Sequence, residues 1–162
     1  MTARASSVWL SAGLVGFALT LNACGFGSST FSLSNANVDA GYSCPDKANN
    51  ARYDVNATID ANNGTSKSVT IQSVDAVMTV TAVQGIWLQK VGDQYDAGSV
   101  TFTPTSVGSG ASAKLKVTVP SACTHGQGAT GANYGEYSIA FTVATSAGTF
   151  KVTSKNRHRI LA

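Results

Sequence analysis

The feature that most constrains the fold of this chain is a two-residue alternation of apolar and polar side chains. Across residues 53–60, apolar side chains occupy the odd positions and polar side chains the even ones. Residues 114–119 and 137–143 repeat the pattern. This period is that of a β-strand with one buried face, whereas the 3.6-residue period of a helix occurs only near the N-terminus. The sequence therefore predicts an all-β fold.

Turn signals between the alternating runs divide the chain into seven or eight short strands, which indicates an antiparallel sandwich of two sheets. Asn62-Asn63-Gly64 predicts a hairpin between strands near 52–60 and 67–74, because Asn-Gly favours two-residue hairpin turns. A change of phase in the next apolar run predicts a β-bulge near residues 73–75. We expect the bulky triplet at residues 86–88 to plug one end of the core, and residues 105–113 to form a flexible loop.

Composition excludes several classes of protein. Only 12% of the 162 residues are charged, against roughly 25% in an average soluble domain. A disordered chain is excluded because 43% of the residues are hydrophobic and the net charge is only +3. The 11 basic residues are spread along the chain and cluster only at the C-terminus, which argues against a nucleic-acid partner. The low charge also leaves few ionisable groups for catalysis, so we expect no enzymatic activity.

The first residues have the pattern of an export signal. Arg4 is followed by an apolar run over residues 8–21, shorter than the ~20 residues that a membrane-spanning helix needs. The run ends in Leu21-Asn22-Ala23-Cys24, which resembles the lipobox of bacterial lipoproteins, with Asn22 in place of the usual small residue. The resemblance implies removal of residues 1–23 and attachment of a diacylglyceryl group to Cys24. The alternative is an ordinary signal peptidase that cuts after Gly25 and discards the cysteine.

The chain has three cysteines, an odd number for an exported protein. If Cys24 is acylated or removed, Cys44 and Cys123 remain as a pair that an oxidising compartment would join in a disulfide. Two free buried cysteines are the alternative. We therefore expect a signal helix over residues 1–23, a flexible, Ser- and Gly-rich tether over 24–40, in which a short strand could begin at Phe31, and a sandwich domain over 41–162.

The last predicted hairpin narrows the fold class further. Gly135, Tyr137 and Ile139 have the spacing seen at the start of strand F in immunoglobulin-like domains, with Ile139 at the position of the antibody cysteine. Residues 135–152 therefore resemble the closing F and G strands of that fold. The resemblance implies an immunoglobulin-like β-sandwich and carries no function with it.

The sequence offers little for catalysis or metal binding, and we expect no cofactor. The histidines, His125 in a Gly-rich loop and His158 in a basic tail, are interpreted as solvated, and two histidines exclude a three-histidine metal site. Gly126-x-Gly128-x-x-Gly131 matches a dinucleotide fingerprint as text, but no helical pattern follows it. Asp93 and Asp96 are interpreted as turn residues rather than as a catalytic pair or calcium ligands.

Recognition is the more credible role, and aromatic side chains are the candidates for it. Tyr95 and Tyr134 fall in predicted loops, where an exposed ring can stack on a sugar or anchor a protein. Trp87 and Tyr137 are further candidates, although a tryptophan in an apolar triplet is more typical of a core. The basic C-terminal residues 151–159 are interpreted as a solvated strand and tail, with contact to anionic lipid or cell-wall polymer as the alternative.

Taken together, the sequence indicates a lipid-anchored β-sandwich of the bacterial cell envelope that faces the periplasm or the exterior. Its expected role is that of a non-enzymatic binding or structural module. Its expected partners are the membrane, through Cys24, and an unidentified protein or glycan. A carbohydrate- or cell-wall-binding module that uses the loop aromatics is the alternative, and a hydrolase with paired loop carboxylates is less favoured.

Overall fold

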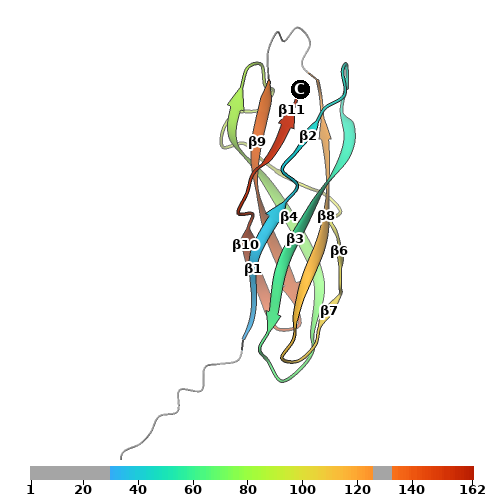
Figure 1. Ribbon diagram of the computed structural model, residues 1–162, viewed down its shortest axis with the longest axis vertical. Coiled ribbons are helices and arrows are strands. Elements are labelled where there is room, and N and C mark those ends of the chain that lie inside the picture. The colour runs from blue at the N-terminus through green and yellow to red at the C-terminus, as the bar shows by residue number, and fades with distance from the viewer. Residues whose placement is uncertain (1–29, 126–132) are drawn as a thin grey trace, which may run out of the picture.

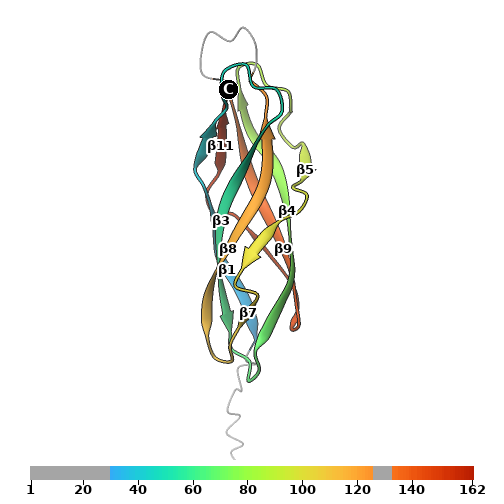
Figure 2. The same cartoon turned by 90° about the vertical axis from the view of Figure 1, so that its right-hand side faces the viewer.

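A computed structural model describes residues 30–125 and 133–162, which form an elongated sandwich of two β-sheets (Figures 1 and 2). No helix in these two ranges is long and apolar enough to cross a membrane. The predicted signal segment, Cys24 and the glycine motif at 126–131 lie outside the described residues. The strands are β1 (Phe31–Val38), β2 (Gly41–Ser43), β3 (Ala51–Asn63), β4 (Val69–Gln84), β5 (Gln94–Asp96), β6 (Thr101–Thr103), β7 (Ser106–Val107), β8 (Ser112–Cys123), β9 (Tyr134–Thr145), β10 (Gly148–Thr153) and β11 (His158–Leu161).

The order of the strands is that of an immunoglobulin-like domain. One sheet has the order β1-β3-β8-β6, which corresponds to A-B-E-D. The other has the order β2-β11-β9-β4-β5, in which β9 and β4 occupy the places of F and C, and β10 and β11 both pair with β9 as G. All pairs are antiparallel except β2 with β11. The predicted antiparallel sandwich is confirmed, with more strands than expected because long edge strands are broken into short pieces.

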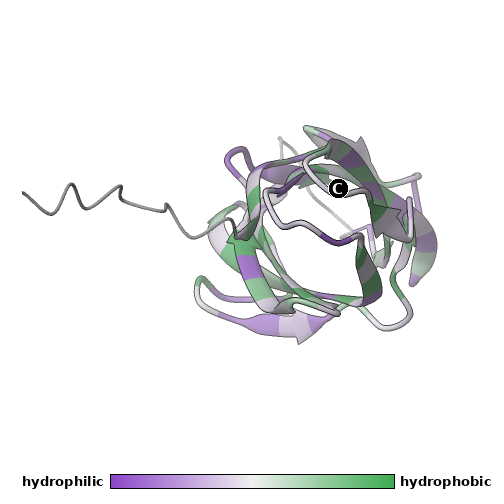
Figure 3. Cartoon of the chain, turned by 90° about the horizontal axis from the view of Figure 1, so that it is seen from below, coloured by the Kyte–Doolittle hydropathy of each residue, from purple (hydrophilic) through white to green (hydrophobic). Residues whose placement is uncertain are grey.

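The core lies between the sheets and follows the predicted alternation. On β8, Leu115, Val117 and Val119 are at most 1% exposed, whereas Lys114 and Lys116, which alternate with them, face solvent. Figure 3 shows this alternation as green and purple bands along the strands that surround the interior. Each buried aliphatic side chain contributes roughly 1.5–3 kcal/mol relative to an exposed one. The predicted bulge is also present, as a register shift of β4 between Ile71 and Ser73.

The predicted hairpin at Asn62-Asn63-Gly64 is wrong, because β3 and β4 lie in different sheets. Neither Asn63 nor Gly64 has the positive φ that an Asn-Gly hairpin turn requires. The Asn63 side chain is instead fully buried and donates to the carbonyls of Lys67, Val107 and Gly108. Its Oδ1 accepts from the backbone and hydroxyl of Thr65. These bonds fix a corner at which the chain crosses between the sheets.

Three segments expected as tether, loop and tail contain strands of the sandwich. The sandwich begins at Phe31 rather than at residue 41, because β1 pairs with β3. The predicted loop at 105–113 contains β7, in which Val107 is buried. The predicted C-terminal tail forms β11, where His158 and Ile160 face the interior. Each of these segments is stabilised by backbone pairing and apolar burial against strands far away in the sequence, which its local pattern does not predict.

The two ends of the sandwich are far apart. Thr30, where the first described segment starts, accepts a hydrogen bond from Gly64 at one end. The other end, called the distal end below, carries Ala51 opposite Cys123 and Gln84 opposite Tyr134. The 16 residues of β4 run between the ends and span about 50 Å at ~3.3 Å per residue. The C-terminus also lies at the distal end (Figure 1).

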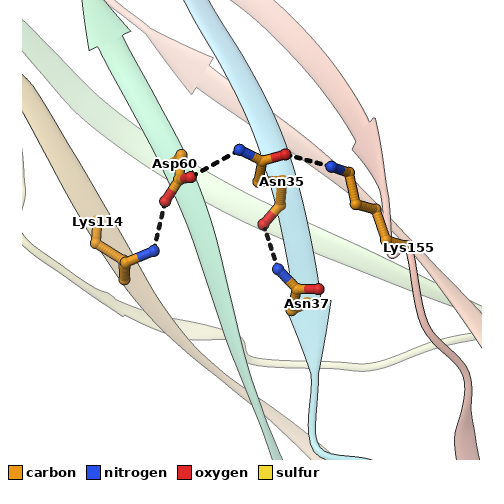
Figure 4. A network of polar contacts seen from close by, with 5 residues as sticks. All are labelled: Asn35, Asn37, Asp60, Lys114 and Lys155. Atoms are coloured by element: carbon orange, nitrogen blue, oxygen red, sulfur yellow. Dashed lines mark hydrogen bonds and ion pairs between the residues drawn. The ribbon is translucent and has the colours of Figure 1, made fainter.

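A network of polar side chains on the outer surface joins β1, β3, β8 and the segment after β10 (Figure 4). Asp60 accepts hydrogen bonds from Lys114 (2.6 Å) and from Asn35 (2.9 Å), and Lys155 donates to Asn35. Asn35 has a φ of 50°, a conformation that asparagine tolerates, and it sits where the pairing of β1 with β3 shifts register. The hydrogen bond from Lys114, followed by that from Asn35, holds the pKa of the Asp60 carboxyl below its ordinary value.

Candidate functional site

A cavity of about 630 Å³ opens at the distal end. Its described wall is built from Asn50 before β3, residues 86–89 after β4, residues 95–98 in and after β5, residues 120–124 at the end of β8, Tyr137 of β9 and Ile160 of β11. Both sheets therefore contribute to it. A volume of this size is within the range of small-molecule sites, about 300–1,000 Å³.

The cavity exists because the sheets are not closed on this side. Strand β6 pairs only with residues 116–118 of β8, so the last residues of β8 are paired only with β3. On the opposite sheet, β5 pairs only with residues 77–79 of β4. Figure 2 views the side of the sandwich on which β5 and β7 lie. The short edge strands thus leave the two sheets apart at the distal end.

Aromatic side chains form one wall of the cavity. The Trp87 indole N–H donates to the Tyr137 hydroxyl (3.0 Å), which in turn donates to the Gln89 side chain. The Tyr95 ring meets the Tyr137 ring edge to face, with centroids 6.0 Å apart. A Cβ at Gly135 would lie 2.5 Å from the Trp87 ring, so this glycine makes room for the indole. Burial raises the pKa of Tyr137 to about 12, and the bond from Trp87 opposes part of that rise.

The opposite wall comes from the end of β8 and carries one unpaired hydroxyl. Ser121 Oγ is buried and makes no hydrogen bond to any residue that the structure describes. Burial raises the pKa of Tyr95 and of Tyr53. Asp96 is the one ionisable acid in the described lining, which contains no Lys, Arg or His. The cavity is therefore almost free of charge.

The rim of the cavity exposes apolar side chains. Ile86 is 63% exposed and Leu88 is 84% exposed, and both line the opening. The expected plug of residues 86–88 is therefore wrong except for Trp87, which packs against the core. The cause is the turn at Gly85, whose φ of 71° ends β4 and sends alternate side chains inward and outward. Exposed apolar side chains gathered beside a cavity are typical of a binding surface.

The structure brings three of the four candidate recognition residues together. Trp87, Tyr95 and Tyr137 line the cavity. Tyr95 lies in β5 and is half-buried, so its expected place in an exposed loop is corrected. Tyr134 lies at the start of β9, outside the cavity lining, and the Arg159 guanidinium covers its ring at 4.4 Å while also bonding Glu136. Its ring is thus already stacked.

Sequence reasoning missed other residues of the cavity. Ser121 and Ile160 carry no local signal of a site. They share the cavity only because β8 and β11 both end at the distal end. The ligand-binding role of Trp87 and Tyr95 remains a prediction.

The Cys44–Cys123 disulfide expected from the cysteine count is present beside the cavity, with Cα atoms 5.9 Å apart. It ties the segment after β2 to the end of β8. Cys44 also donates its backbone N–H to Leu161 at 2.7 Å. The bond therefore holds the distal ends of both sheets together.

The interpretation of His158 as a solvated tail residue is wrong. The side chain is 1% exposed, with Nδ1 2.8 Å from the Asp39 carbonyl and Nε2 3.1 Å from the Tyr53 hydroxyl. A carbonyl only accepts, so Nδ1 carries the proton and Nε2 accepts from Tyr53. Burial lowers the pKa of His158, and the bond to Asp39 opposes part of that shift. His125 lies in its loop as expected, beside Asp46 at 3.9 Å.

Among the described residues, Asp93 and Asp96 do not form part of a facing carboxylate pair at the cavity or of a metal-binding cluster. Asp93 accepts from the backbone of Lys90 at 2.8 Å and serves as a turn residue. Asp96 stands without a second carboxylate in the described lining, whereas glycosidases use two facing acids. No group of three or more His, Cys, Asp or Glu side chains that could hold a metal occurs within residues 30–125 and 133–162.

Comparison with known proteins returns no matching family model and no matching curated protein. Among solved structures, the chain is similar to the ASH/PapD-like domain of human CEP192, with 13% identity, a TM-score of 0.35, and coverage of 99% of this chain and 97% of that one. It is also similar to the CooA pilin subunit of enterotoxigenic Escherichia coli, with 14% identity, a TM-score of 0.31, and coverage of 80% and 99%. The VesB protease of Vibrio cholerae gives 10% identity, a TM-score of 0.27, and coverage of 79% and 32%. Likenesses this weak transfer no function to the chain.

Proposed function

We propose that this protein is an exported, lipid-anchored module of the bacterial cell envelope that binds a ligand or partner at its distal end without catalysing a reaction. The lipobox-like Leu21-Asn22-Ala23-Cys24 supports the anchor, and the Cys44–Cys123 disulfide suits an oxidising compartment. The observation that carries the proposal is the place of the cavity, at the end of the sandwich opposite Thr30.

The geometry of the anchor explains why this place matters. The seven residues from Cys24 to Thr30 are joined by six steps and span at most about 22 Å, even when fully extended. That reach is well below the ~50 Å length of β4. A lipid on Cys24 would therefore hold the Thr30 end near the membrane and present the cavity and its apolar rim away from it.

The anchor is tested by mass spectrometry of the mature N-terminus from membrane fractions. We expect a chain that begins at Cys24 and carries a diacylglyceryl group, and we expect Cys24→Ser to move the protein to the soluble fraction. Ser28→Ala is the matched control and should stay with the membrane. An unmodified chain that begins after Gly25, or membrane retention of Cys24→Ser, contradicts the anchor.

The orientation is tested by energy transfer to dansyl-labelled lipid in proteoliposomes that hold the acylated protein. Trp87 lies at the distal end and should transfer little energy to the bilayer. A variant that combines Trp87→Phe with Phe31→Trp moves the donor to the Thr30 end and should transfer strongly. Equal transfer from both proteins contradicts the proposed orientation while leaving the anchor itself intact.

A further inference from the structure

We propose that the distal cavity holds a single acyl chain that bears an uncharged polar head, as in a monoacylglycerol. This inference rests on the proposed function of the distal end as a binding site and names its ligand class. The wall supplies three aromatic rings, Trp87, Tyr95 and Tyr137, together with the aliphatic Ile160. Such a surface matches a hydrocarbon chain.

The hydrogen bonding of the wall argues against a sugar. Sugars present many hydroxyls, and each needs a partner when it leaves water. Two polar groups of the aromatic wall are already bonded, because the Trp87 indole N–H donates to Tyr137 and the Tyr137 hydroxyl donates to Gln89. Breaking these bonds to receive sugar hydroxyls would leave buried polar atoms unpaired. The carbohydrate alternative therefore fits this cavity less well than an apolar ligand does.

The charge of Asp96 and the unpaired hydroxyl of Ser121 indicate what kind of polar head the ligand carries. Asp96 is the one charged side chain in the described lining, so an anionic head such as a free carboxylate would meet repulsion and no basic partner. Ser121 Oγ is buried and lacks a hydrogen-bond partner in the described residues. Rotation about the Cα–Cβ bond of Ser121 would bring this hydroxyl to the cavity that the residue lines, where it would satisfy one ester or hydroxyl oxygen. One such hydroxyl matches an uncharged head with few polar atoms.

The rim explains how such a ligand would enter and what its binding would bury. Ile86 and Leu88 expose most of their side chains at the opening. Burying apolar surface is the main favourable contribution to binding of this kind, and each buried methylene is worth ~0.8 kcal/mol, or about fourfold in Kd. Affinity should therefore rise by about that factor with each added methylene until the chain fills the cavity.

Trp87 gives a direct readout, because the chain has two tryptophans and the other, Trp9, lies in the predicted signal segment. The titration uses the full chain carrying Trp9→Phe and Cys24→Ser, so that Trp87 is its single tryptophan and no acyl group of its own competes. Monoacylglycerols of eight, ten and twelve carbons, dodecanoate and chitotriose are added below micellar concentrations. We expect saturable changes in Trp87 emission for the glycerides, affinity that grows about fourfold per methylene, and binding of dodecanoate weaker by about tenfold.

Matched variants test the geometry. Ala122→Leu narrows the opening and should abolish the signal, whereas Ala111→Leu, an exposed change outside the cavity, should leave it unchanged. Ser121→Ala should weaken glyceride binding by about three- to tenfold, and Asp96→Asn should reduce the discrimination against dodecanoate. Trp87→Phe should remove the fluorescence change, which assigns the signal to the cavity.

The outcomes distinguish three questions: which ligand binds, whether its acyl chain comes from a bilayer, and whether the protein itself is lipid-anchored. Sedimentation with phosphatidylcholine vesicles shows whether the acyl chain is taken from a bilayer, and binding of glyceride monomers alone indicates a free lipid. Saturable binding of chitotriose with no glyceride signal overturns the inference in favour of a glycan, and no signal from any ligand overturns it outright. Neither result affects the mass of the mature N-terminus, so the proposed lipid anchor is tested independently by mass spectrometry.

Discussion

Removing the disulfide tests how the distal end is stabilised. Cys44 and Cys123 are separated by 79 residues and are 8% and 5% exposed. Closing a loop of that length lowers the entropy of the unfolded chain, which the chain-entropy model converts to about 4.5 kcal/mol at 25 °C. Against a typical total of about 5–15 kcal/mol, this is a large share of the free energy of unfolding. Replacing both cysteines by alanine should therefore destabilise the protein by about that amount.

The assay is guanidinium chloride unfolding followed by far-ultraviolet circular dichroism. Alanine is used because serine would place a hydroxyl in a buried site. The slope of the free energy against denaturant should also increase, because the unfolded chain expands once the cross-link is gone. Wild type unfolded with a reductant should match the double variant, and Cys24→Ser should match oxidised wild type. A loss below about 1.5 kcal/mol with an unchanged slope would refute the loop-entropy argument.

Three further predictions concern buried or paired polar groups. Burial lowers the pKa of His158, so the stability that its neutral form contributes should be complete above pH 6.5 and should fall below that pH by at most ~1.4 kcal/mol per pH unit. Thermal unfolding of wild type between pH 7.5 and 5 should show this loss of stability, and the His158→Gln variant should not show it. Asn63→Ala should cost about 3 kcal/mol in denaturant unfolding, because it leaves buried carbonyls unpaired, whereas the exposed Asn62→Ala should cost little. Lys114→Met should raise the pKa of Asp60 toward its ordinary value in an NMR titration, and Lys116→Met should not.

The candidate site was only partly accessible from the sequence. Trp87 and Tyr95 could be selected as recognition residues because aromatic side chains near turns are rare and conspicuous. Tyr134 satisfied the same criterion, yet the Arg159 side chain covers it in the fold. Ser121 gave no signal, because an unpaired buried hydroxyl is defined by neighbours from other strands. A cavity is a property of several chain segments at once, and local pattern does not report it.

The sequence by itself determined which side of each strand faces the core, because alternation is a property of neighbouring residues. That alternation predicted the all-β sandwich, the buried face of β8 and the bulge of β4, and the cysteine count predicted the disulfide. Tertiary structure decided which strands pair, since pairing depends on contacts between residues far apart in the chain. The tertiary structure places Asn63 at a corner between the sheets instead of in the predicted hairpin, and it buries His158. It also leaves the distal cavity open where the edge strands are short.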